Sequence, residues 1–350
     1  ELARHQKRSL RQILALADDD LIGGLGRRVA PEIPVELERL DVRRIRAASD
    51  DAGLEALCRH TTTYPARLHD LPDAPAALFV AAQSDGVGRL SRVAGNTLAD
   101  GPTAVAIVGT RRASAEGNEV ARALGRGLGA AGIGVVSGMA LGIDSAAHAG
   151  SLDAGAPTIA VLAAGADVPY PASKRSLYRR IAAQGCIVSE MPPGFTPYKW
   201  CFPARNRIIA ALAQTTVVVE AAERSGSLIT AEIAADLGRD IGAVPGPVLS
   251  WRAAGTNALL RDGATLVRDT RDVLDAVVGV DDRVAANPGA GLEPRLSSVL
   301  RAVADGRDTL AALAGAPDQA QGTLAALTEL ELLGCLRRVA GGRYVVVPRW

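Results

Sequence analysis

The chain has 350 residues, and its 39 lysines and arginines nearly balance its 38 aspartates and glutamates. That length is more than one hydrophobic core usually organises, so we expect two or three domains. A formal net charge of +1 argues against the broad basic surface of many nucleic-acid-binding proteins, but it permits one focused basic site.

The four cysteines and four histidines show no spacing typical of a metal site. We therefore expect no metal and no cofactor, and we interpret the cysteines as reduced thiols. We expect neither a signal peptide nor a membrane segment, because no apolar run matches the length that crosses a bilayer, and we predict a cytoplasmic location.

Residues 1–75 are predicted to form a small helical, SAM-like domain. Apolar residues recur at helical spacing over 6–17 and 36–48. The glycine-rich stretch 21–28 fits a plain turn between these helices, and a helix-hairpin phosphate clamp is the alternative. Residues 77–81 then fit a short strand.

From residue 103 onward, apolar strand-like runs alternate with helical patterns. Strands are expected at 103–108, 133–137, 158–162, 186–190, 216–220, 240–244 and 265–267, and helices at 114–131, 143–154, 173–183, 206–213, 228–237 and 270–278. Near-continuously apolar strands that alternate with helices indicate a parallel sheet covered on both faces. The predicted fold class is α/β, a Rossmann-like doubly wound and mostly parallel sheet over residues 76–280.

The end of the chain follows a different pattern. Residues 281–294 combine charges, glycine and proline and are predicted to be a linker. Residues 295–350 fit three short helices, at 296–303, 309–314 and 319–333, followed by a β-hairpin. Helix-turn-helix followed by a hairpin is the element order of a winged-helix domain.

The loop after the strand predicted at 103–108 carries residues suited to an anion. Gly109 allows close approach, Thr110 follows it, and Ser114 lies where the next helix begins, so backbone N–H groups there favour an anion. Arg111 can hold a phosphate with two hydrogen bonds. Ligands bind at the carboxyl ends of parallel strands, which favours this role over a merely solvated arginine.

Two further strand-end loops repeat this pattern. The second places Ser137 and Gly138 at a strand end, and the third places Ser225, Gly226 and Ser227 before a predicted helix. Each arrangement fits an anion site, although helix capping alone accounts for one of the serines.

The stretch 200–209 joins an aromatic ring to cations in a predicted loop just before a helix. Lys199 precedes it, Phe202 is a candidate platform for a base, and Arg205 and Arg207 are candidate phosphate ligands. Asn206 can read a base edge or cap the helix. Burial of Phe202 in the core and anchoring of the loop by Arg207 are the structural alternatives.

Motifs typical of catalysis are lacking. A literal G-x-G-x-x-G match begins at Gly127, but it falls late in a predicted helix, so we discard it. Neither a P-loop nor a G-x-S-x-G motif is present. Glu190 and Glu220 end strands without an evident partner, so no catalytic residue is assigned and no enzymatic activity is expected.

The sequence resembles the DNA-processing protein A family, also called DprA or Smf. The matching stretches are residues 107–111, 137–144, 202–210, 225–231 and 244–246 followed by 255–257. The resemblance implies a non-enzymatic protein of natural transformation that binds and protects incoming single-stranded DNA and helps to load the RecA recombinase. It also implies a homodimer formed through the Rossmann-like domain. It places the family's pocket arginine on Arg111, its loop lysine on Lys199 and its stacking aromatic on Phe202.

Two other functions compete with this one. A nucleotide or nucleoside-phosphate hydrolase on a related fold would carry a Pro-Gly-Gly-x-Gly-Thr turn with a nearby glutamate, whereas this chain has Pro-Gly-Pro-Val from residue 245. A transcription regulator would need exposed cations or amides near 319–333, where mainly Gln319 and Gln321 are found. The role of residues 295–350 in duplex binding stays open.

Overall fold

The computed structural model describes residues 41–94, 104–278, 292–304, 306–314, 320–333, 335–339 and 341–346. The helix predicted at 6–17 and the glycine-rich turn at 21–28 lie outside these ranges. The chain divides into two compact units, Glu1–Asp51 and Ala52–Trp350. In the first unit the structure describes helix α5 (Val42–Asp51), which overlaps the helix predicted at 36–48.

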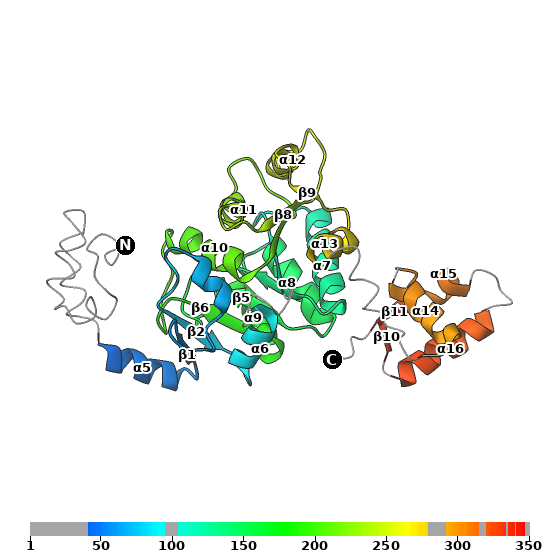
Figure 1. Ribbon diagram of the computed structural model, residues 1–350, viewed down its shortest axis with the longest axis horizontal. Helices are drawn as coiled ribbons and strands as arrows, with labels where there is room; N and C mark the ends of the chain where they lie inside the picture. The colour runs from blue at the N-terminus through cyan, green and yellow to red at the C-terminus, as the bar shows by residue number, and fades with distance from the viewer. Residues whose placement is uncertain are drawn as a thin grey trace. The chain divides into compact units, whose positions relative to one another are not determined.

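A nine-stranded sheet forms the centre of the second unit (Figure 1). Its strands are β1 (Glu55–Cys58), β2 (Ala77–Ala81), β3 (Ala104–Val108), β4 (Gly134–Ser137), β5 (Thr158–Val161), β6 (Cys186–Ser189), β7 (Thr215–Val218), β8 (Asp240–Ala243) and β9 (Thr265–Leu266). The spatial order is β1-β2-β6-β5-β4-β3-β7-β8-β9. Strands β3 to β9 run parallel, and β1 and β2 pair antiparallel at one side. The predicted mostly parallel, Rossmann-like sheet is therefore confirmed.

Helices cover both faces of this sheet. They are α6 (Gly86–Ala94), α7 (Ala115–Ala130), α8 (Ile143–Asp153), α9 (Arg175–Gln184), α10 (Cys201–Leu212), α11 (Gly226–Asp236), α12 (Ala254–Arg261) and α13 (Thr270–Val278), with short 3₁₀ turns η1 (Ala66–Asp70) and η2 (Ala172–Lys174). Side chains of β3 alternate between two cores: Val108 packs with the α10 side, whereas Ile107 packs with the α7 and α8 side. Two buried faces explain why the strands read as continuous apolar runs.

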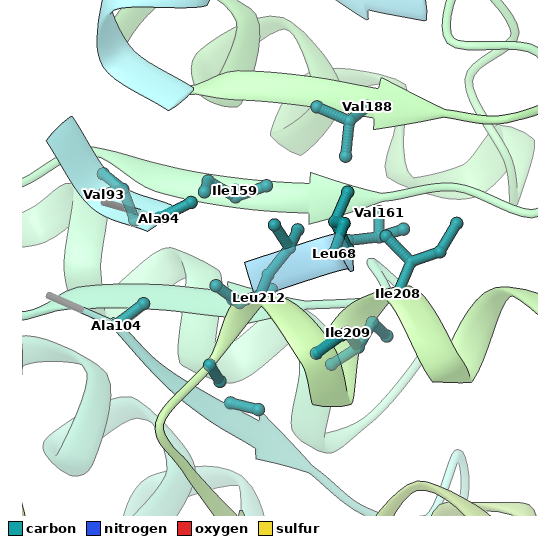
Figure 2. Packing of buried hydrophobic residues seen from close by; sticks show 14 of the residues in the cluster. Leu68, Val93, Ala94, Ala104, Ile159, Val161, Val188, Ile208, Ile209 and Leu212 are labelled. Atoms are coloured by element: carbon teal, nitrogen blue, oxygen red, sulfur yellow. The ribbon is translucent and has the colours of Figure 1, made fainter. Parts of the chain in front are cut away.

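Helix α10 supplies much of one core. Ile208, Ile209 and Leu212 are fully buried and lie close to Ile159 and Val161 of β5 (Figure 2). The apolar side of α10 is thereby fixed against the sheet, and the first turn of the helix is held near the carboxyl ends of the strands.

The start of α10 differs from the prediction. The sequence predicts a helix from residue 206, but α10 begins at Cys201, so the expected loop is the first turn and a half of the helix. The predicted boundary is wrong because Pro203 suggests a break, whereas proline is tolerated in a first turn, where its missing N–H has no helical partner. Phe202 and Asn206 therefore have helical positions.

Helices α7 and α8 approach closely through glycines. A Cβ on Gly150 would lie 2.9 Å from the backbone nitrogen of Arg126, which is too close for a side chain. The discarded G-x-G-x-x-G match falls in the same region, because Gly127 and Gly129 lie inside α7. These glycines serve packing between helices.

The C-terminal elements are α14 (Pro294–Ala304), α15 (Leu310–Ala314), α16 (Ala320–Leu332) and an antiparallel pair, β10 (Leu336–Val339) with β11 (Arg343–Val346). They share a hydrophobic core that includes Leu300, Leu327 and Leu336. The order of three helices and a hairpin agrees with the sequence, while the winged-helix assignment and the domain limits 1–75, 76–280, 281–294 and 295–350 stay predictions. Over the described ranges, no helix combines the length and the apolar character needed to cross a membrane.

Candidate nucleic-acid interface

The parallel strands bring their carboxyl ends to one edge of the sheet. From β3 the chain runs outward through β4 and β5 to β6, then returns to place β7 on the other side of β3. This reversal makes a topological switch point between β3 and β7, the usual position of a ligand in an open α/β sheet. The three strand-end loops and the segment 199–207 that the sequence singles out lie at this edge.

The switch point itself is closed by the chain. The backbone N–H of Thr110 donates to the main-chain oxygen of Glu220 at 2.7 Å, and that of Ser114 donates to the Glu220 carboxylate at 2.8 Å. The Ser114 hydroxyl caps α7 by accepting from Gly117 at 2.9 Å. A Cβ on Gly109 would lie 2.6 Å from Ile143, so the glycine serves close packing. The anion that the α7 N-terminus attracts is thus the carboxylate of Glu220.

Arg111, in the same turn, contacts one ring of an aromatic pair. Its guanidinium carbon lies 4.7 Å from the centroid of the Phe202 ring, and that ring is 5.6 Å from the ring of Tyr170. Arg111 is exposed, Phe202 is half-buried and Tyr170 is 41 % exposed. We call these three residues the arginine–aromatic cluster. It joins segments that follow β3, β5 and β6, and its cation–π contact holds the arginine over the ring.

Lys199 and its neighbours extend the exposed surface before α10. Lys199 is exposed, and Trp200, the N-cap residue of α10, is 58 % exposed without a capping side-chain hydrogen bond. Lys199 lies three residues before Phe202 in the chain. A cation and an indole therefore lie next to the arginine–aromatic cluster in the sequence.

Arg205 is placed differently from the sequence expectation. It is buried, and its guanidinium donates to the main-chain oxygens of Gly138, at 2.8 Å, and of Val161. Burial lowers the pKa of Arg205 to about 10, and the nearby Asp144 opposes that shift. Burial likewise raises the pKa of Asp144, against the effect of Arg205. Arg205 ties the ends of β4 and β5 together and offers no free guanidinium to a phosphate.

Ser137 and Gly138 belong to the same buried region. The Ser137 hydroxyl donates to the main-chain oxygen of Ile107 at 2.6 Å. A side chain on Gly138 would collide with the guanidinium of Arg205. Both residues position the loop after β4 and do not face solvent.

Arg207 anchors its segment to the fold, which was the alternative to a role in phosphate binding. It donates to Glu190 at 2.7 Å and to Asp73 at 2.8 Å, and the side chains of Arg207 and Glu190 are each only 15 % exposed. Because the ion pair between Arg207 and Glu190 is largely shielded from water, it holds α10 to the segment after β6.

Asn206 links α10 to α11. Its amide donates to the main-chain oxygen of Gly226 at 3.1 Å. The hydroxyls of Ser225 and Ser227 lie 2.7 Å apart, and Ser225 caps α11. Gly226 is exposed, with open space where a side chain would lie. The first turn of α11 is therefore capped by Ser225, with open space beside Gly226.

The sequence reasoning missed two aromatic positions at the same edge. Tyr170 follows β5 and touches Phe202, and Trp251 follows β8 with Arg252 stacked on it. Only 3 % of the residues are aromatic, so an aromatic residue in a segment after a predicted strand could have marked both positions as candidate site residues.

Comparison with known proteins gives a consistent result. The family model of DNA recombination-mediator protein A matches residues 55–278. A putative DNA processing protein DprA of Mycobacterium tuberculosis is 46 % identical over 210 residues, which are 59 % of this chain and 52 % of that protein. The chain therefore spans about half the length of that relative.

Solved structures agree with this match. The X-ray structure of DNA processing protein A from Streptococcus pneumoniae superposes with a TM-score of 0.65 at 33 % identity, covering 79 % of this chain and 89 % of that one. A second structure, of DNA processing protein A from Helicobacter pylori, has a TM-score of 0.55 at 28 % identity over 65 % of this chain and 97 % of that one; it is described as showing a unique single-stranded DNA binding mode of that protein. The family model alone spans all nine strands of the sheet and the whole carboxyl edge described above. The chain belongs to the DNA recombination-mediator protein A family.

Proposed function

We propose that this chain binds single-stranded DNA at the carboxyl edge of its sheet. The observation that carries the proposal is the arginine–aromatic cluster, in which Arg111 lies over Phe202 and Tyr170 extends the aromatic surface. The relative from Helicobacter pylori, with its single-stranded DNA binding mode, supports the same ligand class.

The chemistry of the cluster favours unpaired bases. Aromatic rings stack on the faces of bases, an interaction of about 1–3 kcal/mol per base that tolerates any sequence. In a duplex those faces are covered by neighbouring base pairs, so the rings of Phe202 and Tyr170 have nothing to stack on. Arg111 and Lys199 then neutralise phosphates, and the counterions released make the affinity fall as salt rises.

The predicted site residues take two roles in this proposal. Arg111, Lys199 and Phe202 contact the strand directly, and Gly226 offers its open backbone. The others position the loops at the carboxyl edge of the sheet: Gly109, Thr110, Ser114, Ser137, Gly138, Arg205, Asn206, Arg207, Ser225 and Ser227. This division follows from the hydrogen bonds that these residues form within the chain and, for Gly109, from its close packing against Ile143.

We further propose that the bound strand is left chemically unchanged. The two carboxylates that end strands are both engaged, Glu190 with Arg207 and Glu220 with Ser114. A nucleoside-phosphate hydrolase would need such a group free to act as acid or base. Incubation with nucleoside monophosphates tests this point, and release of free base would favour the hydrolase.

The resemblance extends the proposal to partners. We infer a homodimer formed through the Rossmann-like domain, protection of the strand during natural transformation and help in loading RecA, in the cytoplasm. Loading is tested by following RecA filament growth on single-stranded DNA covered by a single-strand-binding protein, with and without this chain. An unchanged rate of filament growth would contradict that part.

The binding proposal is tested by fluorescence anisotropy with a labelled oligonucleotide. Single- and double-stranded forms of one sequence are titrated side by side at several salt concentrations. We expect a clear preference for the single strand and an affinity that declines with salt. Equal affinity for both forms would contradict base stacking as the basis of binding.

A further inference from the structure

A second arginine–aromatic pair lies at the carboxyl edge, after β8. Trp251 is 56 % exposed, and the guanidinium carbon of Arg252 lies 4.6 Å from the centroid of its ring. The corresponding distance between Arg111 and Phe202 is 4.7 Å. Each pair therefore places a guanidinium over an aromatic ring at nearly the same distance.

The backbone after β3 connects the two pairs. The Arg252 Nε donates to the main-chain oxygen of Arg112 at 3.2 Å, and Arg112 is the exposed neighbour of Arg111. Two consecutive residues of this turn therefore take part in different contacts: Arg111 lies over Phe202, and Arg112 binds Arg252. Because Arg252 is half-buried and tied to this turn, Trp251 is held in place next to it.

We propose that Trp251 and Arg252 form a second base-stacking platform, which extends the path of a single strand from Phe202 across the turn at Arg111 and Arg112. This inference rests on the proposed function and adds a second contact region for the same ligand. One face of the indole is covered by Arg252, and the exposed remainder offers a surface on which a base can stack.

The charges along this path suit a polyanion. Among the described residues, no carboxylate forms an ion pair with Arg111, Arg112 or Arg252. Three arginines without an ion pair to a described carboxylate therefore follow the path: Arg111 at the first platform, Arg112 in the turn and Arg252 at the second platform. Phosphates that link bases on the two platforms would pass over them.

The spacing of the β-strands sets the length of single-stranded DNA that can reach both platforms. Tyr170 follows β5 and Trp251 follows β8, and β4, β3 and β7 lie between those strands. Four intervals of about 4.8 Å place the two strand ends about 19 Å apart. A stacked strand rises about 3.4 Å per nucleotide, so roughly six nucleotides would cover this distance. A short oligonucleotide therefore fits one platform only, whereas a longer one reaches both.

The test compares oligothymidines of about 3 and about 12 nucleotides, one shorter and one longer than this span. We expect Trp251→Ala to lower the affinity for the longer one about tenfold, which corresponds to about 1.4 kcal/mol, and to leave the affinity for the shorter one unchanged. Trp251→Phe keeps a ring and should retain binding, whereas Trp251→Leu keeps an apolar side chain without a ring and should lose it. Phe202→Ala should weaken both oligonucleotides.

A second measurement leaves residue 251 intact. The chain has three tryptophans, so Trp200→Phe combined with Trp350→Phe leaves Trp251 as the single indole fluorophore. Its fluorescence should be quenched by the longer oligothymidine, because a stacked base quenches indole emission, and not by the shorter one.

The outcomes separate the two proposals. If the unmodified protein binds neither oligothymidine, the proposed function fails, and this inference fails with it. If it binds both, Phe202→Ala weakens both, and Trp251→Ala weakens neither, only the second platform is overturned. An equal loss for both lengths in Trp251→Ala also overturns it, because Trp251 would then belong to the first contact region.

Discussion

The carboxylate of Glu220 accepts a hydrogen bond from the backbone N–H of Ser114 at 2.8 Å, at the point where α7 begins. The N-terminus of a helix attracts an anion, and here the protein supplies that anion itself. The switch point of the sheet is therefore a structural junction, and the surface open to a ligand lies beside it, at the arginine–aromatic cluster.

Replacing Glu220 with alanine should destabilise the protein. The N–H of Ser114 would lose its acceptor in a half-buried position, which costs about 1–3 kcal/mol. Glu220→Gln keeps an oxygen acceptor and should lose less, and sulfate should restore part of the stability of Glu220→Ala by occupying the vacated helix end. Urea denaturation measures each effect, with the exposed neighbour Glu223→Ala as the control. Equal stability of Glu220→Ala and Glu223→Ala would contradict this role.

Arg111 and Arg205 should respond in opposite ways to substitution. Arg205→Met leaves the main-chain oxygens of Gly138 and Val161 and the carboxyl of Asp144 without their buried cation, so we expect a loss of about 3–5 kcal/mol in the free energy of unfolding. Arg111→Ala removes an exposed side chain and should change stability by less than about 0.5 kcal/mol.

DNA affinity should show the reverse order for these two arginines. Arg111→Ala should weaken single-strand binding several-fold, because a guanidinium that touches Phe202 is lost from the cluster. Anisotropy and urea denaturation on the same preparations compare the two. A stable Arg205→Met protein with impaired binding would show that Arg205 contacts the strand after all.

The buried His148 should make stability depend on pH. Its Nδ1 lies 2.8 Å from the Thr158 hydroxyl, and burial, with Arg205 adding to the effect, lowers the pKa of His148 to about 3. The pKa of a histidine in the unfolded chain is near 6.5, so between that pH and about 3 His148 is protonated in the unfolded chain and neutral in the folded protein. The stability from this residue is complete above that pH and declines as pH falls toward about 3, by up to about 1.4 kcal/mol per pH unit.

The measurement is the free energy of unfolding between about pH 7 and pH 4, where histidine titrates in the unfolded chain. His148→Gln removes the titrating group and should give a flatter dependence, whatever its stability at neutral pH. His69, which is exposed, provides the control through His69→Gln. Identical slopes for the unmodified protein and His148→Gln would show that His148 is not the group responsible.

The sheet could be predicted because its strands are buried on both faces and therefore form continuous apolar runs. β1 was missed, since Glu55–Cys58 is short and lacks β-branched residues. The site was predicted less completely than the fold. Arg111 and Arg205 both occupy edge segments, and the sequence gives no sign that Arg205 is buried, because its acceptors lie 67 and 44 residues away in the chain. Pairing across such distances is decided by the packing of α10 on the sheet.

Lys199 and Phe202 should be distinguishable by the salt dependence of binding. Lys199→Ala removes one phosphate contact, so the slope of log affinity against log salt should become shallower by about 0.7, the value for one contact with a single strand. Phe202→Leu removes the ring but keeps apolar volume in a half-buried position. It should lower affinity about tenfold at every salt concentration and leave the slope unchanged, because stacking releases no counterions.

The control for the lost charge is Arg92→Ala, which removes a positive charge from an exposed ion pair with Asp85. Arg92 is an exposed arginine of α6, and its neighbour Arg89 binds the main-chain oxygens of Ala183 and Gly185, just before β6 begins. This places α6 at the amino ends of the parallel strands, the edge opposite to the proposed site. A decrease in slope for Arg92→Ala equal to that for Lys199→Ala would mean that the strand responds to overall charge and not to a defined edge of the sheet. A slope that changes only for Lys199→Ala would place a phosphate of the strand next to the first turn of α10, where the ring of Phe202 is within reach of its base.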